Sequence, residues 1–317
     1  MKKKLLVCGA TGFIGRNLVE HFARLPEYEV HATEHLRPRY ACPGVEWIKA
    51  DLTDQAAVEA CVRDKEIVLH AAAITSGAKD MAERPHIHIT DNAVMNSYLL
   101  RACHDHGVKH VVFFSCTVMY PSSEIPLREE DFDANREIYP KYFGPAWTKV
   151  YTEKMCEFFS RLGKTRHTCI RHSNIYGPYD KFDLERSHVL GATLTKIFQA
   201  RDNRIVVWGA GEEARDVLYI RDLVRFVELA LLHQSAPFRI YNVGAGTSVS
   251  IKDLVSTMIK MTGRPIEVVH DLTKPTLNVS IRIDCELAGR ELHWSPEYTL
   301  EQGLRETIDW YQASQVG

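Results

Sequence analysis

Three glycines near the start of the chain have the spacing of a phosphate-binding turn. They separate a short apolar run, residues 5–8, from a helical pattern over residues 16–25. In such a strand–turn–helix unit the first glycine allows the tight turn. The second lets backbone approach a pyrophosphate, and the third lets helix and strand pack closely. The free N–H groups of the helix start attract phosphate oxygens, so the spacing predicts a dinucleotide site. The residues expected around the phosphates are Gly9, Thr11, Gly12, Phe13, Ile14 and Gly15.

An acid at the end of the next apolar run indicates which dinucleotide binds. Residues 28–34 have the pattern of a strand, and Glu34 lies about twenty residues after the glycines, where a carboxylate accepts hydrogen bonds from the ribose hydroxyls of NAD. Arg37 and Arg39 follow closely and offer guanidinium groups to the 2′-phosphate of NADP instead. We expect NAD, with NADP as the alternative.

Two more apolar runs end in residues suited to the same ligand. The run 45–50 ends at Asp51 and Leu52, which are placed to contact the adenine edge. The run 67–73 ends in small side chains, which leave room for a cofactor to lie against the backbone. These small residues are Ala71, Ala72 and Ala73.

Strand and helix patterns alternate through the first half of the chain. Further strands are expected at 111–115 and 168–171, and long helices at 91–106 and 146–162. This alternation predicts a doubly wound parallel sheet with helices on both faces, an α/β Rossmann fold. The two long helices also offer the apolar surface for a homodimer.

The pattern loosens after Ser173, where polar loops suit a region that binds substrate. A later apolar run, 239–243, is expected to return to the main sheet. We therefore expect a dinucleotide-binding domain and a smaller, discontinuous C-terminal lobe. The first comprises residues 1–172 with about 219–243, and the second comprises 173–218 and 244–317.

Composition excludes several classes of function. The 317 residues are 45% hydrophobic and 25% charged, which is ordinary for a globular protein. A net charge of −2 gives no electrostatic case for nucleic acid or an anionic membrane, and no apolar run is long enough to cross a bilayer. The eight cysteines lack the paired spacing of a metal site. We expect reduced thiols, no metal and a cytoplasmic enzyme.

Motifs spread over nearly the whole chain resemble the extended short-chain dehydrogenase/reductases, which include nucleotide-sugar epimerases, dehydratases and reductases. They are the glycine turn, Asn92, Lys149 with Glu153 four residues on, and 174–178 with the sequence NIYGP. Other stretches are similar to the GDP-fucose synthase group within this family. They are 176–182, 187–189, 206–209, 215–216, 242–244 and 274–275. The resemblance implies an NAD(P)-dependent enzyme that converts a nucleoside-diphosphate sugar, with a GDP-sugar favoured, through a keto-sugar. It also places Asn92 among the cofactor-binding residues.

The same resemblance assigns catalytic positions, with one clear departure. Lys149 matches the lysine that holds the nicotinamide ribose and lowers the pKa of a tyrosine one helical turn earlier. Here that tyrosine position is Pro145, which has no ionisable group. The position of the serine that polarises the substrate oxygen is Cys116, followed by Thr117. Cys116 is either an acid–base group or nucleophile, or a small buried apolar residue. Tyr142 is a further candidate proton donor.

His188 matches the histidine of the GDP-fucose synthase pattern, whereas the matching cysteine is replaced by Val118. His188 is expected to act as a substrate-side acid or base, or to hydrogen-bond the sugar. Asn174 resembles the asparagine that holds the pyrophosphate or sugar, and Arg215 the arginine that meets the substrate phosphate. Weaker substrate-binding candidates are Lys181, Trp208 and Lys274.

The missing tyrosine leaves three hypotheses. The first is an enzyme in which hydride moves between the sugar and the nicotinamide. The second is a protein that binds cofactor and nucleotide sugar without redox chemistry, as a sensor or assembly partner. The third is an epimerase that only abstracts a proton and leaves the cofactor unchanged.

Overall fold

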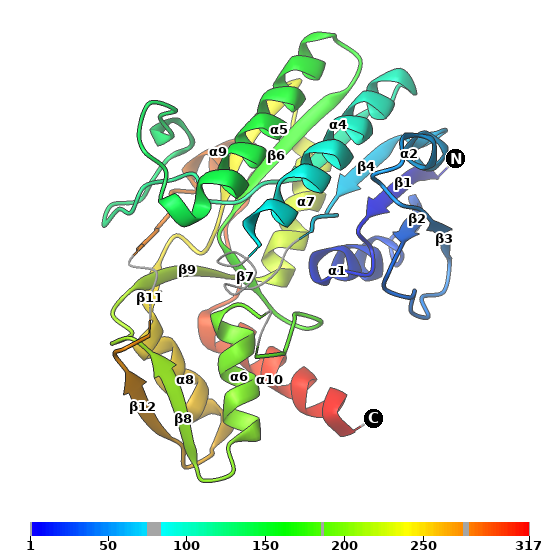
Figure 1. Cartoon of the computed structure of the whole chain (residues 1–317). Coiled ribbons are helices and arrows are strands. Elements are labelled where there is room, and N and C mark those ends of the chain that lie inside the picture. The colour runs from blue at the N-terminus through cyan, green and yellow to red at the C-terminus, as the bar shows by residue number, and fades with distance from the viewer. Residues whose placement is uncertain (1, 75–83, 185–186, 275–278, 317) are drawn as a thin grey trace.

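The computed structural model describes residues 2–74, 84–184, 187–274 and 279–316. At its centre lies a seven-stranded sheet with the order β10-β6-β5-β4-β1-β2-β3, in which every neighbouring pair is parallel (Figure 1). This architecture confirms the predicted doubly wound α/β fold. The strands are β1 (Lys3–Cys8), β2 (Tyr28–Glu34), β3 (Val45–Lys49), β4 (Ile67–His70), β5 (His110–Phe114), β6 (Arg166–His172) and β10 (Phe238–Val243).

Side chains of the central strands alternate between two hydrophobic layers. Leu5 and Val7 of β1 enter one layer, and Leu6 and Cys8 enter the other, because successive residues of a strand face opposite ways. Helices α1 (Phe13–Phe22) and α7 (Ile220–His233) contribute to the first layer. Helices α2 (Gln55–Val62), α4 (Thr90–Asp105) and α5 (Phe143–Arg161) contribute to the second. Burial on both faces explains why these strands are continuously apolar in sequence.

Two helix starts differ from the prediction. Helix α1 begins at Phe13 rather than at residue 16, because Gly12 is its N-cap and Gly15 already lies in the first turn. Helix α5 begins at Phe143 rather than at residue 146, directly after the short 3-10 helix η3 (Pro140–Tyr142). Pro145 is tolerated there because the N–H groups of a helical first turn have no intrahelical acceptor.

The remaining strands form two small sheets beyond the carboxyl edge of the central sheet (Figure 1). One is three-stranded, with the order β11-β9-β7, and consists of β7 (Asn174–Tyr176), β9 (Ala214–Tyr219) and β11 (Ser248–Ser250). The other pairs β8 (Arg204–Trp208) with β12 (Glu267–Asp271). The accompanying helices are α6 (Val189–Gln199), α8 (Ile251–Thr262), α9 (Glu286–Leu292) and α10 (Leu300–Val316), and shorter turns are η1 (Pro85–His88) and η2 (Glu129–Asp131). The predicted lobe boundary at residue 172 stays a prediction.

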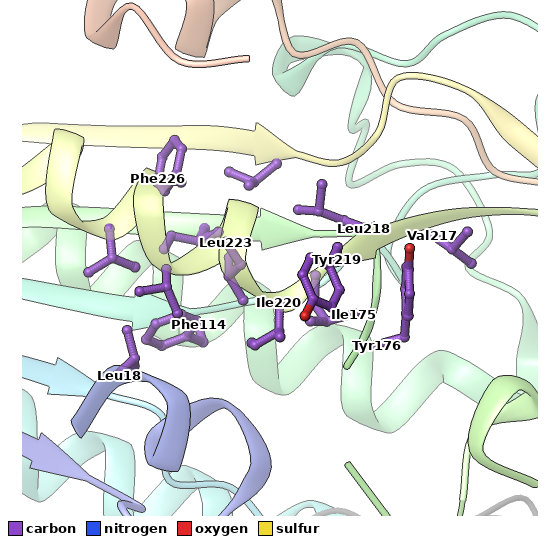
Figure 2. Close-up of a cluster of buried hydrophobic side chains, with 14 of the residues drawn as sticks. Leu18, Phe114, Ile175, Tyr176, Val217, Leu218, Tyr219, Ile220, Leu223 and Phe226 are labelled. Carbon is purple, nitrogen blue, oxygen red and sulfur yellow. The ribbon is translucent and has the colours of Figure 1, made fainter. Parts of the chain in front are cut away.

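One buried cluster connects the two regions. Figure 2 shows this cluster extending from Leu18 of α1 and Phe114 of β5, past Leu223 of α7, to Ile175 of β7 and Leu218 of β9. The cluster holds β7 and β9 against the carboxyl ends of the central strands. None of the helices in the described ranges combines the length and apolar character needed to cross a bilayer.

Candidate active site

The glycine turn connects β1 to α1 and leaves space beside its second glycine. Gly9 has φ +77°, and a Cβ atom there would lie 2.6 Å from the backbone of Ala72. A Cβ on Gly15 would collide with the Gly9 carbonyl oxygen. A Cβ on Gly12 would meet only that oxygen, at 3.2 Å, and no side chain caps the start of α1. The turn therefore fits a bound pyrophosphate, which needs open backbone and free N–H donors. Thr11, Phe13 and Ile14 line the same turn and are all partly exposed.

The end of β2 lies beside this turn. The Thr33 hydroxyl accepts a hydrogen bond from the Gly9 N–H at 3.0 Å, which holds β2 and the turn together. The Glu34 carboxylate is partly exposed and accepts the Arg39 N–H at 2.9 Å. Arg37 is exposed. Glu34 retains a free carboxylate oxygen for a ribose hydroxyl, which stays a prediction.

The other predicted cofactor contacts follow β3 and β4. Asp51 is exposed, and hydrogen bonds from the Thr53 N–H and hydroxyl, at 2.9 and 2.7 Å, lower its pKa. Leu52 is 6% exposed and packs in the second hydrophobic layer. Ala71 and Ala72 are partly buried, and Ala73 is exposed, so small side chains do border the turn.

Asn92 on α4 uses its amide to hold the chain after β4. Its Oδ1 accepts the Ile74 N–H at 2.9 Å, and its Nδ2 donates to the carbonyl oxygens of Ile74 and His88 at 3.0 and 2.9 Å. These bonds fix the exit of β4 next to the glycine turn. A direct contact of Asn92 with the cofactor stays a prediction.

Lys149 of α5 reaches back to the carboxyl end of β5. Its ammonium donates to the Phe114 carbonyl oxygen at 2.6 Å. Desolvation lowers the Lys149 pKa, while the nearby Cys116 and Glu153 raise it. The lysine is thereby held at the edge where the predicted nucleotide site lies, as the resemblance implies.

Cys116 and Tyr142 lie within electrostatic reach of each other at this edge. Burial raises the Cys116 thiol pKa, and the positive charge of Lys149 opposes that increase. Burial also raises the pKa of Tyr142, while Arg215 lowers it and Cys116 raises it. Both groups are therefore neutral hydrogen donors at neutral pH. Thr117, directly after Cys116, is 8% exposed.

A buried ionic network that the sequence analysis missed supports these residues. Arg171 of β6 binds the Glu153 carboxylate through Nη2 and Nε, at 2.7 and 3.0 Å, and both side chains are nearly inaccessible to water. The Ser115 hydroxyl donates to Glu153 Oε1 at 2.6 Å. Arg171 also donates to the Tyr120 hydroxyl at 2.9 Å. The shared carboxylate of Glu153 keeps the ends of β5 and β6 side by side and orients α5, which carries Lys149.

His172, at the end of β6, is a second residue that the sequence analysis missed. Its side chain is partly buried, and desolvation lowers its pKa to about 4, with further lowering by the charges of Lys149 and His188. His188 itself precedes α6, retains access to solvent and has a pKa lowered by desolvation and then by Lys181. No signal in the sequence singles out His172, which simply follows the expected strand 168–171.

The predicted substrate residues lie on the two small sheets and the loops that join them. Asn174 is exposed at the start of β7 and donates to the Asp216 carbonyl oxygen at 3.1 Å. Arg215, its guanidinium near Tyr142, donates to the carbonyl oxygens of Ala214 and Val279. Lys181 is partly buried after β7. Trp208 ends β8 and is 49% exposed, with the Lys274 ammonium 6.0 Å from the centroid of its indole ring.

One group of possible metal ligands lies elsewhere, on β2 and β3. His31 is buried, with Nε2 3.1 Å from Glu29 Oε1 and Nδ1 3.5 Å from Glu46 Oε2. The two carboxylates lie on opposite nitrogens of the ring, and β2 and β3 begin here rather than end. This group is therefore outside the candidate active site.

Comparison with known proteins agrees with this arrangement. The sequence pattern of the NAD dependent epimerase/dehydratase family matches residues 5–244. The chain belongs to this family. Its cofactor class, NAD, is thus that of the family, which confirms the expectation drawn from the glycine turn and Glu34.

Relatives within the family align over nearly the whole chain. GDP-L-fucose synthase of Azorhizobium caulinodans is 29% identical, covering 98% of this chain and 96% of that protein. GDP-L-colitose synthase of Yersinia pseudotuberculosis is 27% identical, covering 97% of each. The structure of MoeE5 in complex with UDP-glucuronic acid and NAD superposes with a TM-score of 0.84 at 24% identity, covering 98% of this chain and 99% of MoeE5. These likenesses confirm the fold and the family resemblance.

Proposed function

We propose that this family member is an NAD(P)-dependent nucleoside-diphosphate-sugar epimerase, dehydratase or reductase that acts on a GDP-sugar through a keto-sugar intermediate. The observation that carries the proposal is the placement of Lys149, which is bound to Phe114 at the end of β5. The charge of Lys149 acts on Cys116, and Cys116 in turn acts on Tyr142. The guanine base is supported by the names of relatives such as GDP-L-fucose synthase.

The cofactor would lie along the carboxyl ends of β1, β2, β4 and β5. The open backbone at Gly12 and the N-terminus of α1 would hold its pyrophosphate. Glu34 would bind the adenosine ribose, with Arg37 available to a 2′-phosphate. Lys149 would hold the nicotinamide ribose. When bound, the cofactor supplies the acceptor and donor for hydride at the sugar carbon.

Proton transfer needs another group because Pro145 replaces the usual tyrosine. Cys116, Thr117, Tyr142 and His188 remain candidates, and Tyr142 is supported by its approach to both Cys116 and Arg215. A raised pKa keeps Tyr142 protonated, so it would donate rather than accept a proton.

The nucleotide sugar would bind between the sheet edge and the two small sheets. Arg215 and Asn174 would meet the pyrophosphate, because guanidinium and amide donors suit phosphate oxygens. Trp208 offers an exposed indole face on which the nucleobase would stack, and the Lys274 ammonium lies near that indole ring. Lys181 and His188 would approach the sugar.

The second hypothesis is a protein that binds both ligands without redox chemistry. Pro145 favours it, since no other residue of α5 replaces the lost hydroxyl at that helical position. The retained His188 favours the enzyme, because it offers an acid or base on the substrate side.

Ligand identification and turnover separate the two hypotheses. Purified protein would be denatured, and any released cofactor identified by absorbance and mass spectrometry. The native protein would then be incubated with GDP-, UDP-, dTDP- and CDP-sugars, including 4-keto forms. Bound NAD(H) with a mass-shifted or epimerised GDP-sugar supports the proposal. Bound cofactor with every sugar returned unchanged supports the non-catalytic hypothesis.

We also propose a cytoplasmic homodimer. All eight cysteines are free thiols, as expected in a reducing compartment. Tyr151 and Phe158 are 43% and 53% exposed on α5, an apolar surface that a partner helix would cover.

A further inference from the structure

His172 and Cys116 both lie at the carboxyl edge of the central sheet, His172 as the last residue of β6 and Cys116 two residues after the end of β5. In the β5–β6 pair, Phe114 is opposite Ile170, and continuing that register places Cys116 opposite His172. The carboxylate of Glu153, bound from both strand ends, keeps the strands together beyond the last paired residues. Neighbouring strands are about 4.8 Å apart, so the continued register brings the backbone of His172 close to that of residue 116, the position of the family's polarising serine.

A hydrogen bond determines which nitrogen of His172 carries the proton. Nδ1 lies 2.8 Å from the carbonyl oxygen of Ser173. A carbonyl oxygen only accepts hydrogen bonds, so Nδ1 is the donor. In the neutral ring Nε2 then carries a lone pair, and no hydrogen bond among the described residues uses it. The ring is partly exposed, so a ligand can reach this nitrogen.

The surrounding charges keep this imidazole neutral. Lys149 approaches from α5 and His188 from the residue before α6, and both charges add to desolvation in lowering the His172 pKa to about 4. Cys116, across from β5, is a neutral thiol because burial raises its pKa. At neutral pH, His172 therefore presents an unprotonated Nε2 to the site.

We propose that His172 is a catalytic base that accepts the proton of the reacting sugar hydroxyl at Nε2, a role that rests on the proposed function. In the oxidising step the O–H bond breaks and its proton moves to Nε2. The C–H bond breaks as the carbon–oxygen double bond forms, and the hydride would go to the oxidised nicotinamide that the family's cofactor supplies when bound. In the reverse step the imidazolium returns the proton to the oxygen. His172 thereby replaces the tyrosine that Pro145 removes.

His172→Asn tests the proposal, because the asparagine amide can still donate to the Ser173 carbonyl oxygen but has no equivalent of Nε2. His270→Asn is the matched control, since His270 Nδ1 also lies 2.8 Å from a carbonyl oxygen, that of Gly209, on β12. Rapid mixing of NAD-loaded enzyme with GDP-sugars would follow the absorbance of reduced nicotinamide. We expect H172N to slow this step by at least about 100-fold while binding of NAD and sugar, measured by calorimetry, is retained. H270N should match the wild type.

A second readout on the wild-type protein needs no turnover. Nitrogen-15 NMR of the histidine rings should show the proton of His172 on Nδ1 at neutral pH and a shifted Nε2 resonance when a GDP-sugar binds. A proton on Nε2, or an H172N rate within about twofold of an active wild type, overturns the role of His172 alone. A wild-type protein that binds NAD but converts no nucleotide sugar, 4-keto forms with reduced cofactor included, overturns the proposed function, and the role of His172 with it.

Discussion

At the scale of single residues, the glycine turn combines two different structural demands. Gly15 has no room for a Cβ, because the Gly9 carbonyl oxygen occupies that position. Gly12 has an extended backbone, with φ −86° and ψ 174°, and only one protein atom near its missing Cβ. Glycine at position 15 is therefore required by the fold, and glycine at position 12 is required by the ligand.

Replacing each glycine with alanine should separate these demands. Gly12→Ala should leave the free energy of unfolding within about 1 kcal/mol of the wild type. It should weaken NAD binding at least about tenfold, because the methyl group occupies the space of the pyrophosphate. Gly15→Ala should destabilise the fold itself. Urea denaturation and calorimetric titration would measure both, and unchanged NAD affinity in G12A would contradict the assignment.

The Cys116 thiol gives a prediction about pH. Burial raises its pKa above the usual 9, despite the nearby Lys149, so the thiolate is scarce at neutral pH. Iodoacetamide should label Cys116 slowly at pH 7.5, and the rate should still be rising with pH above pH 9. Peptide mass spectrometry would follow the labelling. Rapid labelling at pH 7 would show that Cys116 is an activated nucleophile instead.

At the scale of elements, a buried histidine links β5, β6 and the end of α7. His110 Nε2 donates to the Thr168 hydroxyl at 2.8 Å, and that hydroxyl donates to Gln234 at 2.5 Å. Desolvation lowers the His110 pKa to about 3. Between about pH 6.5 and 3 the unfolded chain binds the proton that the folded chain excludes, so this residue makes stability fall as pH falls through that window.

His110→Gln should therefore reduce the sensitivity to acid, since glutamine keeps a donor for Thr168 and does not titrate. The loss of unfolding free energy between pH 7 and 4.5 should be smaller in H110Q than in the wild type. It should not vanish, because the pKa values of His70 and His172 are also lowered to about 4. Equal losses in both proteins, measured by urea denaturation at each pH, would contradict the prediction.

The exposed aromatic residues of α5 give a test of assembly. Phe158→Glu should shift the protein from dimer to monomer, because a carboxylate in an apolar helix contact is left without a partner. Leu232→Glu is the control, since Leu232 is 57% exposed on α7. Light scattering after size-exclusion chromatography would report the mass. A wild-type protein that is already monomeric at micromolar concentration would refute the proposed dimer.

At the scale of the whole molecule, sequence patterns predicted the central sheet better than the substrate region. Apolar strands such as β1 and β5 are buried on both faces, and this leaves a clear signal in the sequence. Strands β7 and β11 contain only three residues each, too few for a periodic pattern. Helix α5 began earlier than expected because its first turn contains Pro145 and Gly144, residues that usually indicate a loop.

The same contrast holds for the candidate active site. The glycine turn was readable because local sequence determines it, and Lys149 was assigned from the family resemblance. The bond between Arg171 and Glu153 and the position of His172 depend on how α5, β5 and β6 pack together. Nothing in the sequence near His172 distinguishes it from an ordinary histidine at a strand end.

The central claim is that this chain moves a hydride between a nucleotide sugar and its cofactor without the usual tyrosine. Isotope transfer tests it most directly. GDP-sugars deuterated at the ring carbons would be reacted with NAD-loaded protein, and product and cofactor analysed by mass spectrometry. We predict deuterium in the reduced cofactor, or retained in the converted sugar. Loss of deuterium to solvent with the cofactor unchanged would indicate proton abstraction alone, and an unchanged sugar would show a binding protein; either result would contradict the claim.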